Sequence, residues 1–424
     1  MAILVIIIFI LGYLAIAFEH PLKLNKAASA LLTGVFCWTA YMLSGVEKDE
    51  AVGQLMHHLG DIASILFFLL GAMTIVELID GHNGFSLITD QIKTRSKVKL
   101  LWIITILTFF ISSVLDNLTT AIVMTSLTAK ILSHKEDRLW FVGMIIIAAN
   151  AGGAFSPLGD VTTTMLWIGG QISAVNIILQ LFIPSILVCL VPLLILSPRF
   201  RKESFEFKKK EENKGDQKDS RIILLAGLSL LLFVPVFKMV THLPPFMGIL
   251  LALGLLWILL AILHESKPPE QKSKLSVTHA LERIDTPSIL FFLGILLAVS
   301  ALESFHILKL LATFLDQTLG NNYVIATALG LLSAIVDNVP LVAASQGMYD
   351  LTSFPTDHYF WELIALTTGT GGSVIIIGSA AGVAAMGIEK IDFMWYLKNI
   401  SWLALAGFLA GIGFFILQRN LIHG

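Results

Sequence analysis

The apolar residues of this chain stand in runs long enough to cross a membrane, and nothing else in the sequence constrains the fold as strongly. Three of these runs, 1–18, 222–237 and 400–417, are almost continuously hydrophobic. Over the whole chain of 424 residues, 56% are hydrophobic. A helix on the surface of a soluble protein shows polar residues at helical spacing, which these runs lack. Helices also satisfy their own backbone groups in lipid. The sequence therefore predicts an all-α polytopic membrane protein.

Charges in the loops predict the side of the membrane that each loop faces. Basic loops stay in the cytoplasm, so the loop with Lys23 and Lys26 is expected there and the acidic segment 45–61 outside. The basic segment 198–221 is predicted to be a solvated cytoplasmic linker, with anionic-lipid contact as the alternative. Residues 85–92 are a candidate interfacial helix. Nothing in the charge pattern points to nucleic acid.

Two apolar segments, 100–115 and 118–132, are too short to be ordinary spans. Each reaches ~24 Å as a helix, against a hydrocarbon core of ~30 Å. Basic residues flank both outer ends, which places these ends on the cytoplasmic side. We therefore predict a re-entrant hairpin over 100–132, with Asp116 and Asn117 at its buried tip.

The next span, 139–172, is interrupted in its middle. Residues 150–160 contain several glycines and Pro157, which end a helix. We expect two half-helices around an unwound loop, with Asp160 as the N-cap of the second. Helices broken near the midplane are where secondary transporters bind ions.

The second half of the chain repeats the first at a nearly constant separation. The matching stretches are 61–69 with 285–293, 112–118 with 333–339, and Gly152-Gly153 with Gly371-Gly372. We predict a first repeat over 1–197 and a second over 222–424. Each holds five spans plus a hairpin, which is an odd number of crossings, so the second repeat is expected to be inverted.

The second repeat supplies its own hairpin and broken span. The hairpin is predicted over 323–350 and the broken span over 360–388. Few cations flank this hairpin, so we expect it to enter from outside. The predicted architecture has ten full spans, two opposed re-entrant hairpins, and both termini external.

Polar residues gather at the interruptions of these spans. The candidate ion- and proton-binding residues are Asp116, Asn117, Asn150, Asp160, Thr162, Thr163, Ser333, Asp337 and Asn338. They offer hard oxygen ligands, which suit a small hard cation, and no span interior holds an Arg or Lys cluster for an anion. Because a buried carboxylate holds either a cation or a proton, competition for it is sufficient for exchange.

Each candidate also has a structural alternative. Asp116, Asp160 and Asp337 are suitable helix caps. The three asparagines are suited to satisfying unwound backbone, and the two threonines to bonding carbonyls of their own helix.

Two motifs resemble a known family. Asp116-Asn117 with Thr119-Thr120, and residues 150–164 with their Ser-Pro-Leu-Gly-Asp-Val-Thr-Thr-Thr ending, resemble the NhaD-type sodium/proton antiporters of the ion transporter superfamily. The resemblance covers essentially the whole chain. It implies exchange of cytoplasmic Na⁺ or Li⁺ for external H⁺, no cofactor, and a homodimer with scaffold and mobile transport domains in the inner cell membrane.

The resemblance also implies which positions bind the ion. Family-essential polar positions fall on Asp116, Asn117, Asn150, Asp160, Thr162, Thr163, Ser333 and Asn338. We expect Na⁺ at Asp116, Asn117, Asn150 and Asp160. In the second repeat Gly369, Ser379 and Ala381 stand where Asn150, Asp160 and Thr162 stand in the first. The first-half cluster is therefore the stronger candidate, and Asp337 the open one.

Two other functions remain as alternatives. Carriers of dicarboxylates, arsenite and other anions belong to the same superfamily, and architecture alone does not separate them from cation exchangers. Residues 157–160 also resemble, weakly, the signature of intramembrane aspartyl proteases, with Asp350 as the second aspartate. A protease needs Asp160 and Asp350 adjacent, whereas a transporter needs Asp116 and Asp160 close together.

Overall fold

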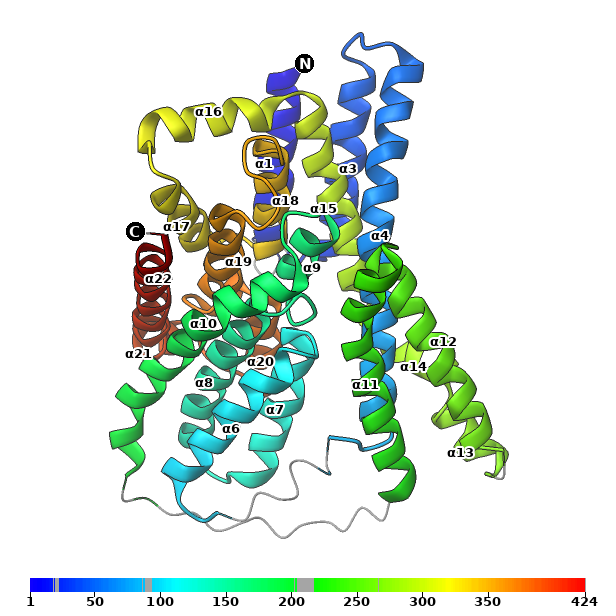
Figure 1. The fold of residues 1–424 in the computed structure, drawn as a ribbon, viewed down its shortest axis with the longest axis vertical. Coiled ribbons are helices and arrows are strands. Elements are labelled where there is room, and N and C mark those ends of the chain that lie inside the picture. The colour runs from blue at the N-terminus through cyan, green and yellow to red at the C-terminus, as the bar shows by residue number, and fades with distance from the viewer. Residues whose placement is uncertain are drawn as a thin grey trace.

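The chain folds into a bundle of helices in a computed structural model (Figure 1). The structure describes residues 1–17, 19, 23–85, 87, 94–201, 203, 217–265 and 267–423. The candidate interfacial helix at 85–92 and the predicted linker 198–221 lie mostly outside these ranges.

Six of the described helices are long and apolar enough to cross a membrane. They are α4 (Lys48–Gly81), α10 (Ala174–Leu196, continued by η1, Ser197–Phe200), α11 (Gln217–Thr241), α12 (Pro245–Leu263), α15 (Thr286–Ser304) and α22 (Ser401–His423). The protein is thus a multi-pass membrane protein. The remaining predicted spans are α1 (Ala2–Ala17) and α3 (Lys26–Met42), which are slightly shorter, and the two spans that are broken.

The segment 45–61 was predicted to be a loop, and this is wrong, because most of it is helical. Helix α4 begins at Lys48 and runs without a break into the apolar span. Residues 48–61 contain no proline, and Asp49 and Glu50 lie in the first turn, where negative charge favours a helix N-terminus. A helix of this length reaches roughly 50 Å, which exceeds even a whole bilayer of about 40–45 Å. Helix α4 therefore extends beyond the membrane.

The first predicted hairpin consists of α6 (Lys97–Ser112) and α7 (Asn117–Ile131), and both pack on α8 (Lys135–Ala154). A Cβ atom at Gly152 of α8 would lie 2.1 Å from the Phe109 carbonyl oxygen of α6. Only glycine permits this approach of the two backbones. After α8 the chain unwinds and then forms α9 (Val161–Ile168), as the interrupted pattern at 139–172 predicts.

The second half contains corresponding elements. They are α17 (Asn322–Leu332), α18 (Asn338–Met348), α19 (Tyr359–Gly371), η2 (Ile376–Gly378) and α20 (Ala380–Glu389). Short helices α13 (Pro269–Lys274), α14 (Val277–Arg283) and α21 (Phe393–Asn399) connect longer ones. Helix α16 (Ile307–Leu319), which the sequence reading did not foresee, lies across one end of the bundle (Figure 1). It buries Leu308 and Ala312 and exposes Leu310 and Phe314.

The helices pack in two groups. Helices α1, α3, α4, α11, α12 and α15 form the long-helix group, in which α3 packs on α15 and α12 on α4. Helices α6 to α10, α17 to α20 and α22 form the hairpin group. Within it the inner arm α7 packs on α20, and α18 packs on α9. Each hairpin therefore meets the broken helix of the other half of the chain.

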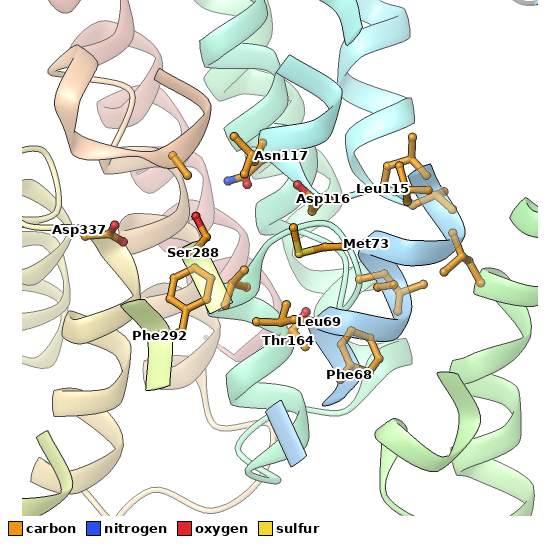
Figure 2. A pocket seen from close by; sticks show the side chains of 18 of the residues that line it. Phe68, Leu69, Met73, Leu115, Asp116, Asn117, Thr164, Ser288, Phe292 and Asp337 are labelled. Carbon is orange, nitrogen blue, oxygen red and sulfur yellow. The ribbon is translucent and has the colours of Figure 1, made fainter. Parts of the chain in front are cut away.

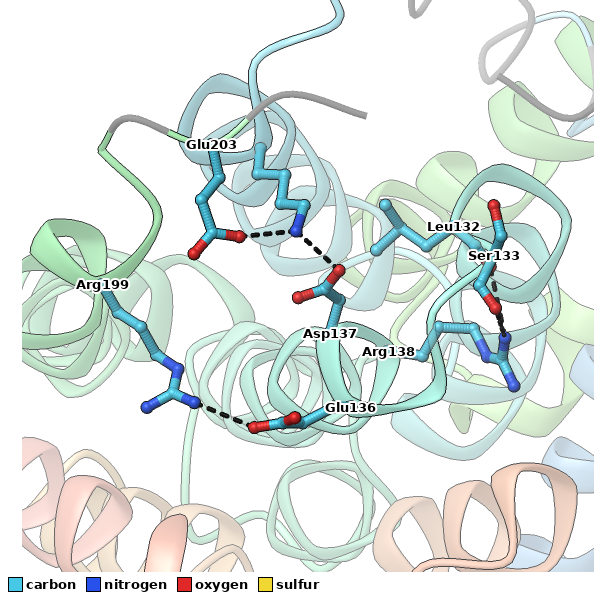
Figure 3. A network of polar contacts seen from close by, with 8 residues as sticks. Leu132, Ser133, Glu136, Asp137, Arg138, Arg199 and Glu203 are labelled. Atoms are coloured by element: carbon cyan, nitrogen blue, oxygen red, sulfur yellow. Dashed lines mark hydrogen bonds and ion pairs between the residues drawn. The ribbon is translucent and has the colours of Figure 1, made fainter. Parts of the chain in front are cut away.

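Ion pairs fix the outer ends of the first hairpin. Lys97, at the start of α6, lies 2.7 Å from Asp137 and 2.5 Å from Glu203. Arg138 of α8 donates to the Ser133 carbonyl at 2.9 Å and pairs with Glu389 of α20 at 2.9 Å. Figure 3 shows Asp137 and Glu203 on either side of the lysine ammonium. These contacts hold the outer ends of α6 and α8 to neighbouring segments. The sequence predicts that these basic ends face the cytoplasm.

Candidate ion-binding site

The tip of the first hairpin lies at Asp116, where α7 begins. Its Oδ1 accepts a hydrogen bond from Thr119 N–H at 2.8 Å, and its Oδ2 accepts one from Thr119 Oγ1 at 2.7 Å. The capping role considered for Asp116 is therefore present. The same side chain lines a cavity, so capping does not remove it from the candidate site.

Asp160, 1% exposed, is the centre of a buried hydrogen-bond network. Its Oδ1 accepts from Thr162 N–H at 2.8 Å and from Thr162 Oγ1 at 2.6 Å, as the N-cap of α9. Its Oδ2 accepts from Asn117 Nδ2 at 2.5 Å. Asn338 Nδ2 of the second hairpin lies 3.5 Å from Oδ1. All of these donors are neutral, so they orient the carboxylate without cancelling its charge.

Asn150 joins this network to the second broken helix. Its Oδ1 accepts from Asn117 Nδ2 at 3.0 Å. Its own amide donates to Ser373 Oγ at 2.8 Å and to Ser379 Oγ at 3.0 Å. Asn117, Asn150 and Asp160 are each 5% exposed or less. The site is therefore built where both interrupted helices and both hairpins meet.

Two of the predicted residues have other partners. Thr163 Oγ1 donates to the Ala154 carbonyl at 3.4 Å, so it provides a partner for the last carbonyl of α8. Ser333 Oγ donates to the Gly330 carbonyl at 2.8 Å and to the Thr368 carbonyl at 3.0 Å. Both hydroxyls bond backbone in this structure. The Thr163 partner lies on α8 and not on its own helix α9, so its bond differs from the own-helix bond considered for the threonines.

Asp337 stands at the tip of the second hairpin, apart from the Asp160 network. It caps α18 by accepting from Val339 N–H at 3.3 Å. Its own backbone N–H donates to the Tyr13 hydroxyl of α1 at 3.0 Å. Figure 2 shows Asp116 and Asp337 on opposite sides of one cavity, with Asn117 between them.

The cavity lies between the long-helix group and the hairpin group. Its volume is about 50 Å³, which is room for a few water molecules at ~10–15 Å³ each. The polar lining comes from Lys26, Asp116, Asn117, Thr164, Ser288 and Asp337. Apolar side chains such as Phe68, Met73 and Phe292 form most of the remaining wall (Figure 2).

Sequence reasoning missed several residues at the site. Ser373 and Ser379 hold Asn150, and Lys26 and Ser288 line the cavity. Ser379 had a signal, because it occupies the repeat position of Asp160. The others had none, because their proximity depends on packing between distant parts of the chain.

Asp350 does not take part in this site. It lies on an exposed turn, where its Oδ1 accepts from Thr352 Oγ1 at 2.6 Å and from Ser353 N–H at 2.8 Å. These bonds, led by that from Thr352, lower the pKa of Asp350 to about 2. An aspartyl protease needs two adjacent aspartates that share a proton, and Asp350 has neither that position nor that partner.

The chain matches known membrane carriers over most of its length. A family model described as "Citrate transporter" matches residues 4–369. Sodium/proton antiporter 1 of Arabidopsis thaliana is 50% identical over 417 residues, which are 98% of this chain and 72% of that protein.

Bacterial relatives match as completely. The Na(+)/H(+) antiporter NhaD of Alkalimonas amylolytica is 30% identical over 99% of this chain and 91% of its own length. The NhaD of Vibrio cholerae is 31% identical over 98% of this chain and 91% of its own. These relatives are transporters rather than enzymes. The chain therefore belongs to the NhaD-type sodium/proton antiporters, within the family whose model is described as citrate transporter.

Proposed function

We propose that this protein exchanges cytoplasmic Na⁺ or Li⁺ for external H⁺, and that Asp116, Asn117, Asn150 and Asp160 form the binding site. One observation carries the proposal. Asp160 is buried at the meeting point of both broken helices and has only neutral donors around it. The Arabidopsis and Alkalimonas relatives are named as sodium/proton antiporters, which supports the same activity.

The chemistry follows from the cost of a buried charge. An isolated carboxylate in a low-dielectric site is expensive, so it is paired with a cation or takes up a proton. Oxygen ligands from carboxylates, amides and hydroxyls suit Na⁺ and Li⁺. Because one carboxylate does not hold both a proton and a metal cation, arrival of one releases the other. That competition is the coupling of an antiporter.

An anion carrier of citrate or a similar acid is the competing function, and the description of the family model raises it. The charges at the cavity oppose it. Among the described residues of the lining, Asp116 and Asp337 contribute two carboxylates, against the single ammonium of Lys26. A negatively charged lining repels an anion.

The two halves of the chain, 1–197 and 222–424, form an inverted repeat in this proposal. Equivalent close contacts support it. A Cβ atom at Gly371 would lie 1.9 Å from the Gly330 carbonyl oxygen, as one at Gly152 would lie close to that of Phe109. Ser112 Oγ donates to the Ala149 carbonyl at 2.6 Å, and Ser333 Oγ to the Thr368 carbonyl at 3.0 Å. Both pairs of contacts recur at the separation seen in the sequence.

Alternating access then arises from movement of the hairpin group against the long-helix group, an elevator-like mechanism. The position of the cavity between the groups supports this idea. We further propose that α6–α7 and α17–α18 are re-entrant hairpins, that the protein works as a homodimer, and that it resides in the inner cell membrane.

The test uses everted membrane vesicles acidified by respiration, with a dye that reports the pH gradient. Adding NaCl or LiCl should alkalinise vesicles that contain the wild type, whereas KCl and citrate should not. Asp116→Asn removes one carboxylate with little change in size, and it should abolish the response. Asp61→Asn, an exposed aspartate on α4, is the matched control and should behave as wild type.

Two results would contradict the proposal, and a third would invalidate the assay. Citrate-driven proton movement without a cation response would assign the protein to anion transport. Full Na⁺ response in Asp116→Asn would remove that residue from the site. Equal loss in Asp61→Asn would mean that the assay reports expression rather than chemistry.

A further inference from the structure

One cation faces the two carboxylates of the cavity. Lys26 is the first residue of α3, and it lines the same cavity as Asp116 and Asp337. No other Lys or Arg is among the described residues of that lining. The mechanism proposed above does not use Lys26.

Local structure directs the lysine side chain into the cavity. Asn25 caps α3 by accepting from Ala27 N–H at 2.9 Å, which fixes where the helix starts. The Lys26 ammonium then lies 5.0 Å from the ring centre of Phe291 on α15, a cation–π contact. The Asp337 carboxylate lines the same cavity. Lys26 is only partly exposed, whereas Lys23 in the same loop is exposed.

The oxygen ligands alone do not explain a monovalent substrate. Two carboxylates with neighbouring amide and hydroxyl oxygens are the donor set that proteins also use for Ca²⁺. Selectivity against a divalent ion therefore needs a second property of the site. Net charge supplies that property. When neither carboxylate carries a proton or a cation, Asp116, Asp337 and Lys26 leave a single negative charge on the described lining, which does not include Asp160.

We infer that Lys26 is a specificity-determining residue, whose ammonium offsets one carboxylate charge so that the cavity accepts one monovalent cation and rejects divalent ones. This inference rests on the proposed cation exchange. It assigns the selectivity to a residue of the long-helix group, outside the hairpins that hold the ligands. It also predicts that the charge of residue 26 matters more than its shape.

The experiment measures ion binding directly on purified protein in detergent. Unfolding temperature is followed against NaCl and against CaCl₂, with choline chloride holding ionic strength constant, because a bound ion stabilises the folded state. The variants are Lys26→Met and Lys26→Gln, which remove the charge in an apolar and a polar form. Lys26→Arg keeps the charge, and Lys23→Met removes an equal charge from the same loop outside the cavity.

We expect wild type, Lys26→Arg and Lys23→Met to be stabilised by Na⁺ and not by Ca²⁺ at the same concentration. Both charge-removing variants should bind Na⁺ roughly ten-fold more tightly and Ca²⁺ roughly a hundred-fold more tightly, because the Coulomb energy scales with the charge of the ion. In vesicles the same variants should show a lower KM for Na⁺ and inhibition by Ca²⁺.

Unchanged Ca²⁺ affinity in both Lys26→Met and Lys26→Gln would overturn the inference, even if both variants antiport Na⁺. An equal gain in Lys23→Met would also overturn it, since the effect would then come from the loop as a whole. Failure of the proposed function looks different. The wild type would give no Na⁺ response in vesicles, while the effect of Lys26 on Ca²⁺ binding would still be measured on purified protein.

Discussion

Asp160 and Asp116 each serve as a helix cap and as a lining or network residue at the same time. Their backbone partners fix the carboxylate in one orientation, which costs a ligand little further ordering when it binds. Each cap also leaves at least one oxygen lone pair for other partners. The capping role of these aspartates is therefore compatible with the ion-binding role proposed for them, because the cap holds each carboxylate in one orientation.

Histidine at the end of α4 makes stability depend on pH. His82 is 5% exposed, and its Nδ1 lies 2.6 Å from the Leu78 carbonyl oxygen. A carbonyl only accepts, so His82 Nδ1 holds the proton, and Nε2 faces His264 Nε2 at 3.2 Å. Burial, more than any other cause, lowers the pKa of His82 to about 4. His82 is therefore neutral in the folded protein at neutral pH.

The sign of the pH effect follows from this shift. In the unfolded chain His82 has an ordinary histidine pKa of ~6.5, so it binds a proton as pH falls below that value. In the folded protein His82 binds this proton only near pH 4, so the unfolded state binds more protons in between. Stability is thus fully present above pH ~6.5 and is lost as pH falls toward 4, by about 3 kcal/mol in all. Thermal unfolding of the purified protein across this range should show the loss, and His82→Gln should flatten it. A His82→Gln curve as steep as that of wild type would refute the account, whereas His134→Gln, at an exposed position, should leave the curve unchanged.

Much of the site was predictable residue by residue, but not all of it. Asn117, Asn150, Asp160 and Thr162 share one network in the structure, and each stands at an interruption of an apolar segment, which is the signal that singled them out in the sequence. Lys26 gave no such signal. A lysine in a short basic loop is usually a solvated charge, and only packing of α3 on α15 turns it toward Asp337.

At the scale of elements, one ion pair joins the two broken spans at their outer ends. Arg138 is the first-turn cation of α8, and Glu389 ends α20, with side chains 18% and 5% exposed. Arg138→Gln leaves the Glu389 carboxylate buried without its partner, which costs on the order of 3–5 kcal/mol. We expect a clear fall in unfolding temperature and in the amount of folded protein in the membrane, measured by fluorescence-detected size exclusion.

A second ion pair, which is exposed, shows whether the cost of losing Arg138 comes from burial or from the loss of a charge alone. Arg199 pairs with Glu136 at 3.1 Å, but both side chains are largely exposed. Arg199→Gln should therefore cost no more than about 2 kcal/mol, because it removes this exposed pair, worth about 0–1 kcal/mol, and the cation–π contact of Arg199 with the Trp140 ring at 4.4 Å, worth about 0.5–1 kcal/mol. The double variant Arg138→Gln/Glu389→Gln should recover much of the loss, because no charge is then left unpaired. Equal effects of Arg138→Gln and Arg199→Gln would disprove the argument.

The helices were predictable wherever the length of an apolar segment and the position of its helix-breaking residues gave the same prediction. The two arms expected within 100–132 correspond to α6 and α7 in the structure. The interruption expected at 150–160 corresponds to the turn between α8 and α9. Charge alone misled at 45–61, because a charged segment without proline or glycine pairs continues a helix beyond the membrane. Helix α16 was not foreseen, because only the structure shows that Leu308 and Ala312 are buried against the bundle while Leu310 and Phe314 stay exposed.

On the scale of the whole molecule, the candidate site lies at the seam between the two helix groups. The hairpin group holds the carboxylates, and the long-helix group contributes Tyr13, Lys26 and Ser288 around them. Transport by relative movement of the groups requires contacts across the seam that form in one state and break in another. Phe68 of α4 and Trp167 of α9 contact one another across the seam, with ring centres 6.2 Å apart.

Crosslinking across this seam should therefore stop transport. In a background without Cys37 and Cys189, the double variant Phe68→Cys/Trp167→Cys is treated with a short bifunctional thiol reagent, and antiport is followed in everted vesicles. Trp38→Cys/Ser300→Cys is the control, because Trp38 Nε1 lies 3.3 Å from Ser300 Oγ within the long-helix group. The crosslink across the seam should arrest Na⁺-driven alkalinisation and the control crosslink should not. Full activity with the seam completely crosslinked would mean that the groups do not move past one another, and access would then have to alternate within the hairpins themselves.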